Sequence, residues 1–145
     1  NSLPEFHRTY IEEVTEAPIH NKDTFRVIIA GSKSFDNYRL FKKKCDYYLK
    51  SKLATHQVIV VSRTSWKTSC MIDMIEEYAR DRELIVEHYE VDWEKYGKRA
   101  AYVSEDEMLS HADALIAFSD EIGTTTGYLI KEAKAKGIKV GDVKY

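Results

Sequence analysis

Three short segments rich in small polar residues contain the side chains of this sequence that could bind an anion. The first is Gly31-Ser32-Lys33-Ser34, the second begins with Ser62 and Arg63, and the third runs from Ser119 to Thr126. Glycine and serine allow backbone N–H groups to approach an anion closely, and a lysine or arginine can neutralise its charge. A helix N-terminus adds a partial positive charge. This combination predicts phosphate or nucleotide binding.

The individual motifs leave alternatives open. The first segment, beginning at Gly31, matches neither GxGxxG nor GxxxxGK[ST], and Gly-Ser pairs are common in ordinary turns. Thr125 and Thr126, at the end of the third segment, could contact the ligand or simply cap the following helix. Asp92 could reach the ligand from the end of a strand, or it could cap the next turn while Trp93 closes the core.

Histidine and cysteine spacing gives no support for a metal site. The five histidines are dispersed and show neither HxxxH nor HExxH spacing. The two cysteines, Cys45 and Cys70, have no CxxC spacing, and we interpret them as free thiols. We therefore expect neither a metal nor another cofactor.

Apolar runs that alternate with helical patterns predict the elements that position these segments. In an α/β sheet of parallel strands, helices cover both faces and ligands bind beyond the carboxyl ends of the strands. The sequence thus predicts a three-layer Rossmann-like α/β fold of about five mainly parallel strands, with the polar segments on one shared rim. The expected strands are Phe25–Ala30, Gln57–Val61, Leu84–Val91, Ala114–Phe118 and Ile138–Val143.

Capping signals set the helix boundaries. Asp36 or Asn37 is placed to cap the first helix, Ser104 and Glu107 have capping-box spacing, and Gly137 is placed as a left-handed stop. The basic run at residues 42–44 falls mostly on the outer face of its helix, where a solvated surface competes with a phosphate-binding patch. The expected helices cover about 37–50, 68–81, 104–111 and 126–136.

Length and composition favour one domain. The chain has 145 residues, of which 43% are hydrophobic, enough for a single core. We assign residues 1–24, with Pro4 and Pro18, to an arm or short helix, and residues 25–145 to the domain. The net charge of -2 disfavours nucleic acid as the main partner. Four acidic residues in the first seventeen argue against a secretory signal, and no apolar stretch is long enough for a membrane span, so we expect a cytoplasmic protein without membrane partners.

Three segments together resemble the YspA-type branch of the SLOG superfamily, over about Phe25 to Val140. They are Val27–Phe35, Asp92–Lys98 and Met108–Phe118, and the last two are more specific than the Gly-Ser turn. The resemblance implies a Rossmann-like fold and a nucleotide or nucleotide-derived ligand. Some SLOG domains cleave a nucleoside monophosphate at its glycosidic bond. Related domains often self-associate, so the resemblance also makes a homo-oligomer an expected state.

The sequence departs from this family at three positions of the expected site. Relatives carry a glycine-rich phosphate loop after the second strand, whereas residues 62–69 contain no glycine. Relatives have an Arg-Asn pair where this chain has Ser104-Glu105, and a Gly-Thr where it has Thr125-Thr126. A Cβ atom blocks close backbone approach, so we expect a remodelled site.

Three functions follow as hypotheses. A non-catalytic nucleotide-binding or sensing domain is favoured by the retained first loop and the missing glycine-rich loop. A glycosidic hydrolase would need a carboxylate with a cation around the sugar, and the candidates are Asp92, Asp120 or Glu121 with Lys33 or Arg63. A protein-interaction module is suggested by the ten tyrosines and the N-terminal arm.

Overall fold

The computed structural model describes residues 23–32, 35–63, 70–119 and 124–145, and these form an α/β sandwich. The strands are β1 (Thr24–Gly31), β2 (Gln57–Arg63), β3 (Ile85–Tyr89), β4 (Ala114–Ser119) and β5 (Lys139–Lys144). The helices are α2 (Tyr38–Thr55), α3 (Cys70–Arg82), α4 (Trp93–Tyr96), the 3-10 turn η1 (Gly97–Arg99), α5 (Ala100–His111) and α6 (Thr124–Ala135).

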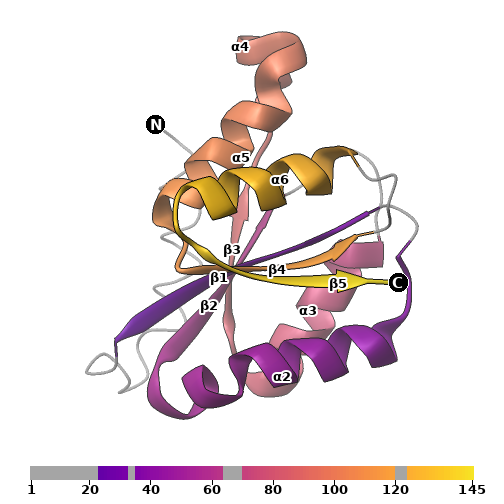
Figure 1. Ribbon diagram of the computed structural model, residues 1–145, viewed down its shortest axis with the longest axis vertical. Coiled ribbons are helices and arrows are strands. Elements are labelled where there is room, and N and C mark those ends of the chain that lie inside the picture. The colour runs from indigo at the N-terminus through magenta and orange to yellow at the C-terminus, as the bar shows by residue number, and fades with distance from the viewer. Residues whose placement is uncertain (1–22, 33–34, 64–69, 120–123) are drawn as a thin grey trace.

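The five strands form one parallel sheet in the order β3-β2-β1-β4-β5. Helices α2 and α3 cover one face, and α5 and α6 cover the other (Figure 1). The predicted three-layer Rossmann-like architecture is therefore confirmed. The chain moves outward from β1 first through β2 and β3, then through β4 and β5, so the strand order reverses between β1 and β4. In sheets of this kind a crevice opens at that point.

The face under α2 and α3 has an aromatic core. Phe118 of β4 stacks on Phe35 and on Phe41, with ring centroids 4.7 and 5.2 Å apart, and Phe41 meets Tyr78 edge to face at 5.8 Å. All four side chains are almost fully buried. Cys45 lies in the same cluster, and burial raises the pKa of its thiol far above the ordinary value. It is a free cysteine, as predicted.

The face under α5 and α6 has an aliphatic core with a buried ion pair beside it. Ile28, Leu115 and Ala117 pack against Met108 and Leu129. The Arg26 guanidinium of β1 reaches across β2 to Glu87 of β3, with two hydrogen bonds of 3.1 Å. That hydrogen bonding and the Glu87 charge raise the pKa of Arg26 despite the opposing effect of burial.

Several predicted boundaries differ from the structure. The first helix continues past Lys50 to Thr55, and the third strand is shorter than predicted. The capping box at Ser104 and Glu107 is wrong: α5 begins at Ala100, because the preceding 3-10 turn runs directly into it, and Ser104 lies buried inside the helix. The first strand begins at Thr24, one residue inside the segment assigned to the arm.

Other local predictions are confirmed. The Asn37 side chain accepts a hydrogen bond from the Leu40 N–H at 3.1 Å and so caps α2. Gly137 has a φ of 78°, the left-handed conformation that ends α6. On the outer face of α2, Lys42 and Lys43 are exposed. Among the described residues, no helix combines the length and the apolar character needed to cross a bilayer.

Candidate functional site

The carboxyl ends of β1 and β4 meet at the point where the strand order reverses. Gly31 pairs with Phe118 in the register of the two strands. One residue later, the Ser32 N–H donates to the Phe118 carbonyl at 3.0 Å. The connection from β1 then leads to α2 on one face, and the connection from β4 leads to α6 on the other. The predicted rim therefore has its centre between Ser32 and Ser119.

Gly31 has a packing role that the sequence did not reveal. A Cβ built on this glycine would lie 2.3 Å from the Met71 methyl group and 3.1 Å from the Phe118 carbonyl oxygen. The glycine therefore allows the first turn of α3 to pack directly on the end of β1. The Met71 methyl group is the end of a flexible side chain and can move aside, so the Phe118 carbonyl is the firmer constraint on a side chain at this position.

The loop after β1 is anchored at both of its described ends. Phe35 is 1% exposed, and its N–H donates to the Ser32 carbonyl at 3.2 Å. The Ser32 hydroxyl shares a hydrogen bond with the Tyr145 hydroxyl, and the Tyr145 ring meets the Phe35 ring edge to face at 4.8 Å. Lys33 and Ser34, which were predicted to bind the ligand, lie outside the described residues.

Ser119 belongs to a polar cluster with two residues of the neighbouring strand. The residue is 2% exposed, and its hydroxyl donates to Asp142 Oδ1 at 3.1 Å and accepts from Lys144 Nζ at 3.0 Å. Lys144 also forms an ion pair with Asp142, with 3.4 Å between Nζ and Oδ2. The lysine side chain is 60% exposed, so it can turn toward a ligand at the rim. Ser119, Asp142 and Lys144 together form the Ser119 cluster.

Ser62 does not join this cluster. It lies within β2 rather than in the predicted loop, and it is 2% exposed. Because side chains alternate along a strand, Ser62 shares the α2/α3 face with Val60, whereas Ser119 shares the α5/α6 face with Ala117. The sheet therefore separates the two serines. Arg63 ends β2 opposite Tyr89, and its side chain lies outside the described part of the structure.

The two threonines occupy the first turn of the last helix. Because α6 begins at Thr124, Thr125 and Thr126 lie inside the helix and not at the N-cap position before it. Thr126 is 5% exposed, and the side chain of Thr125 lies outside the described part. Thr126 therefore has a packing role in a helix that starts at the rim.

Asp92 caps α4, which is one of the two interpretations that the sequence left open. Its carboxylate accepts from the Lys95 N–H at 3.0 Å, and the residue is exposed. The companion prediction, that Trp93 closes the core, is wrong because Trp93 is 44% exposed. Helix α4 projects away from the sheet beyond the N-terminal end of α5 (Figure 1), and none of its four residues is buried.

Sequence reasoning missed Asp142 and Lys144, and it also missed the buried Glu105. The last strand was predicted to end at Val143, whereas β5 runs to Lys144, and the two-residue spacing of Asp142 and Lys144 places both on one face of it. Glu105 was noted only as a departure from the family pattern, yet it is 2% exposed on the inner side of α5. A search for polar residues at alternating positions would have found the first two only if the last strand had been extended by one residue to Lys144.

The described residues contain no group of three or more His, Cys, Asp or Glu side chains arranged to hold a metal ion. Comparisons of the chain with protein-family models, with curated proteins and with solved structures find no match. The function of this site therefore has to be inferred from the residues that form it. A buried hydroxyl and a partly free ammonium at a strand-order reversal can bind and orient an anionic group.

Proposed function

We propose that this chain is a nucleotide-binding or nucleotide-derivative-binding domain that does not catalyse a reaction. Its ligand would lie at the carboxyl ends of β1 and β4, with a phosphate group near the Ser119 cluster. The observation that supports this proposal most directly is the contact of Lys144 with Ser119 beside the strand-order reversal. The resemblance of the sequence to SLOG domains points to the same class of ligand.

The Ser119 cluster supplies the two kinds of donor that a phosphate needs. Lys144 has an ammonium with three N–H donors, of which the contacts to Ser119 and Asp142 use only a part. A phosphate oxygen could replace the Asp142 carboxylate as the acceptor for Lys144 and for the Ser119 hydroxyl. Because the Asp142 carboxylate repels an anion, Lys144 and the Ser119 hydroxyl must leave Asp142 when a phosphate binds. We expect affinity in the micromolar range or weaker.

Isothermal titration calorimetry of the full chain with AMP, ADP and ADP-ribose tests this proposal. We expect one of these compounds to bind and Lys144→Met to weaken its binding about tenfold, because a charge-assisted hydrogen bond to the ligand is lost. Ser119→Ala should weaken it by a smaller factor. Lys134→Met, which removes an exposed lysine of α6, is the matched control and should leave affinity unchanged.

Two results would contradict the proposal. The first is an absence of binding at millimolar concentrations of all three compounds. The second is binding that Lys144→Met and Lys134→Met weaken equally, because the effect would then reflect the net charge of the chain. Assay of the AMP samples for free adenine separates binding from hydrolysis, and we expect none to be released.

A second candidate, a protein-interaction module, is favoured by the aromatic side chains near α4. Trp93 is 44% exposed, Tyr96 37% and Tyr102 49%. Exposed aromatic residues that lie together often mark a protein contact. Affinity capture with the full chain tests this alternative: a specific partner should be lost with Trp93→Ala/Tyr96→Ala and retained with Lys144→Met. Retention by both variants would argue against this surface.

A further inference from the structure

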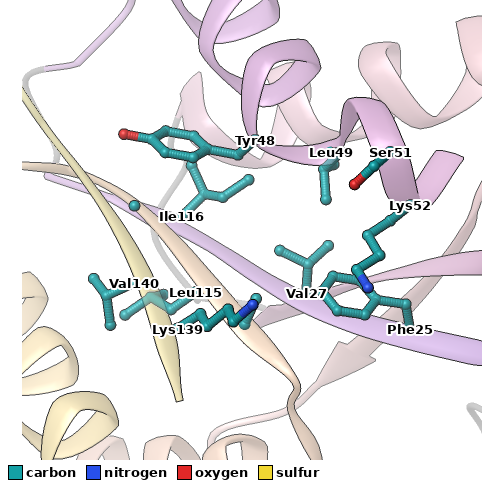
Figure 2. A pocket seen from close by; sticks show the side chains of 12 residues that line it. Phe25, Val27, Tyr48, Leu49, Ser51, Lys52, Leu115, Ile116, Lys139 and Val140 are labelled. Carbon is teal, nitrogen blue, oxygen red and sulfur yellow. The ribbon is translucent and has the colours of Figure 1, made fainter. Parts of the chain in front are cut away.

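A second concave surface lies at the opposite end of the sheet from the Ser119 cluster. It is a groove of about 470 Å³ between the last turns of α2 and the amino halves of β1, β4 and β5. Val27, Leu49 and Ile116 of the α2/α3 core lie beneath it and are almost fully buried, so its accessible apolar surface comes from residues above them such as Phe25 and Tyr48. Figure 2 shows the lining side chains beneath the end of α2. The volume lies within the range of about 300–1,000 Å³ that is typical of small-molecule sites.

Aromatic side chains flank the groove at its two ends. Tyr48 of α2 lies directly over Gly141 of β5: three of its ring carbons are 2.7, 2.8 and 2.9 Å from the position that a Cβ on Gly141 would occupy. The missing side chain at Gly141 thus lets the ring rest on the strand backbone. Phe25 of β1 flanks the other end (Figure 2). A flat or elongated apolar group fits between these two rings.

The charged side chains of the groove are both cationic. Among the described residues that line it, Lys52 and Lys139 are charged, and this part of the chain contributes no aspartate or glutamate to the lining. Lys52 comes from α2 and its Nζ lies 5.2 Å from the centre of the Phe25 ring, whereas Lys139 comes from β5 (Figure 2). Ser51 adds a hydroxyl on the α2 side. An apolar surface beside two ammonium groups is complementary to a molecule with an apolar body and an anionic end.

We propose that this groove binds a small amphipathic carboxylate, whose chain or ring packs between the accessible rings of Phe25 and Tyr48 and whose carboxylate pairs with Lys52 and Lys139. The apolar contact contributes affinity by removing hydrocarbon surface from water. The lysines orient the ligand, because a carboxylate cannot pack on the apolar surface without losing its hydration. This site is independent of the proposed nucleotide site, which lies at the other end of the strands.

Titration of the full chain with octanoate, followed by amide NMR, tests this proposal. We expect the largest shifts at residues 25–27, 48–52, 114–116 and 139–141, with no comparable shifts at Ser119 or Lys144. Octan-1-ol has the same chain without the charge and should bind at least about tenfold more weakly, which corresponds to about 1.4 kcal/mol. Lys52→Met/Lys139→Met should reduce octanoate affinity by a similar factor while keeping the apolar part of both side chains.

The control variant is Lys43→Met/Lys134→Met, which removes two exposed lysines outside the groove and should bind octanoate like the unmodified chain. Equal loss in both double variants would overturn the proposal, as would the absence of groove shifts at millimolar octanoate. Nuclear Overhauser contacts between residues 1–22 and Lys52 or Lys139 in the free protein would also overturn it, because the chain itself would then occupy the groove. Concentration-dependent groove shifts without octanoate would assign the surface to a second copy instead.

Discussion

The two faces of the sheet are built differently. The α2/α3 face is closed by stacked rings, with Phe118 between Phe35 and Phe41. The α5/α6 face is closed by aliphatic side chains and holds the Arg26–Glu87 pair, in which the Glu87 side chain is only 6% exposed. The Ser119 cluster lies on this second face as well. Ser62 is buried on the first face, but the Arg26–Glu87 pair and the Ser119 cluster both lie on the second.

Polar contacts exist on the α2/α3 face too, but at its border with solvent. Asp46 of α2 accepts hydrogen bonds from Tyr78 at 2.8 Å and from Arg82 at 2.9 and 2.8 Å. Its side chain is 41% exposed, against 6% for Glu87. Because solvent screens the Asp46 pair and not the Glu87 side chain, the same kind of ion pair should matter more on the α5/α6 face.

The largest expected effect is on the aromatic core. Phe118→Ala should lower the free energy of unfolding by about 3–5 kcal/mol, because it leaves a cavity between two stacked rings. Leu115→Ala, on the same strand but on the other face, should cost less than Phe118→Ala, within the range of about 2–5 kcal/mol for such a truncation. Urea denaturation followed by circular dichroism measures both values. A larger loss for Leu115→Ala would reverse the comparison between the faces.

The next effect concerns the buried ion pair. Arg26→Met should cost about 2–3 kcal/mol, because it leaves the Glu87 carboxylate buried without its cation while partial exposure of Arg26 moderates the loss. The double variant Arg26→Met/Glu87→Leu should recover most of the stability, since it removes both charges. Urea denaturation of the single and double variants gives the values. If the double variant is no more stable than Arg26→Met, the loss comes from packing and not from the unpaired charge.

A smaller effect is expected at the start of α2. Asn37→Ala should lower the free energy of unfolding by about 1 kcal/mol, because the Leu40 N–H loses its acceptor. Asn37→Asp retains an acceptor at the same position and should stay close to the unmodified chain. Thermal denaturation followed by circular dichroism compares the two variants. Equal losses in both would show that the hydrogen bond to Leu40 does not stabilise α2.

The smallest effect is a pH dependence at the border of the α2/α3 face. Burial alone would raise the pKa of Asp46, but hydrogen bonds from Arg82 and Tyr78 and the Arg82 charge outweigh it and lower that pKa. A carboxylate whose pKa is lowered by folding stabilises the protein above its unfolded pKa of about 3.9, and this contribution disappears as the pH falls through the folded pKa. Because the Asp46 side chain is 41% exposed, solvent screening keeps this contribution to the free energy of unfolding below about 1 kcal/mol.

Asp46→Asn tests that contribution. The variant should be less stable than the unmodified chain near neutral pH, and the difference should shrink as the pH is lowered toward about 2. Denaturant titrations at several pH values measure this difference. A difference that stays constant with pH would mean that the amide substitution acts through shape or hydrogen bonding and not through the charge.

Local patterns in the sequence were enough for the elements and the class of fold. Apolar runs give the strands because a buried parallel strand needs apolar residues on both faces. Asn37 and Gly137 mark helix ends because capping and a left-handed φ depend on the residue itself. The structure brings only some of the predicted rim residues together. Ser32 and Ser119 lie at the ends of the neighbouring strands β1 and β4, whereas Asp92 caps α4. Lys33 and Ser34 lie outside the described residues.

Which distant residues share a site depends on how the strands and helices pack together. The pairing of Ser119 with Lys144 depends on the register of β4 and β5, and the separation of Ser62 from Ser119 depends on which helices cover each face. The groove at Lys52 and Lys139 depends on how far α2 extends over the sheet. These relations join segments far apart in the chain, so no local pattern contains them. The strands and their layered arrangement could be predicted from local patterns, because burial and backbone preference act residue by residue.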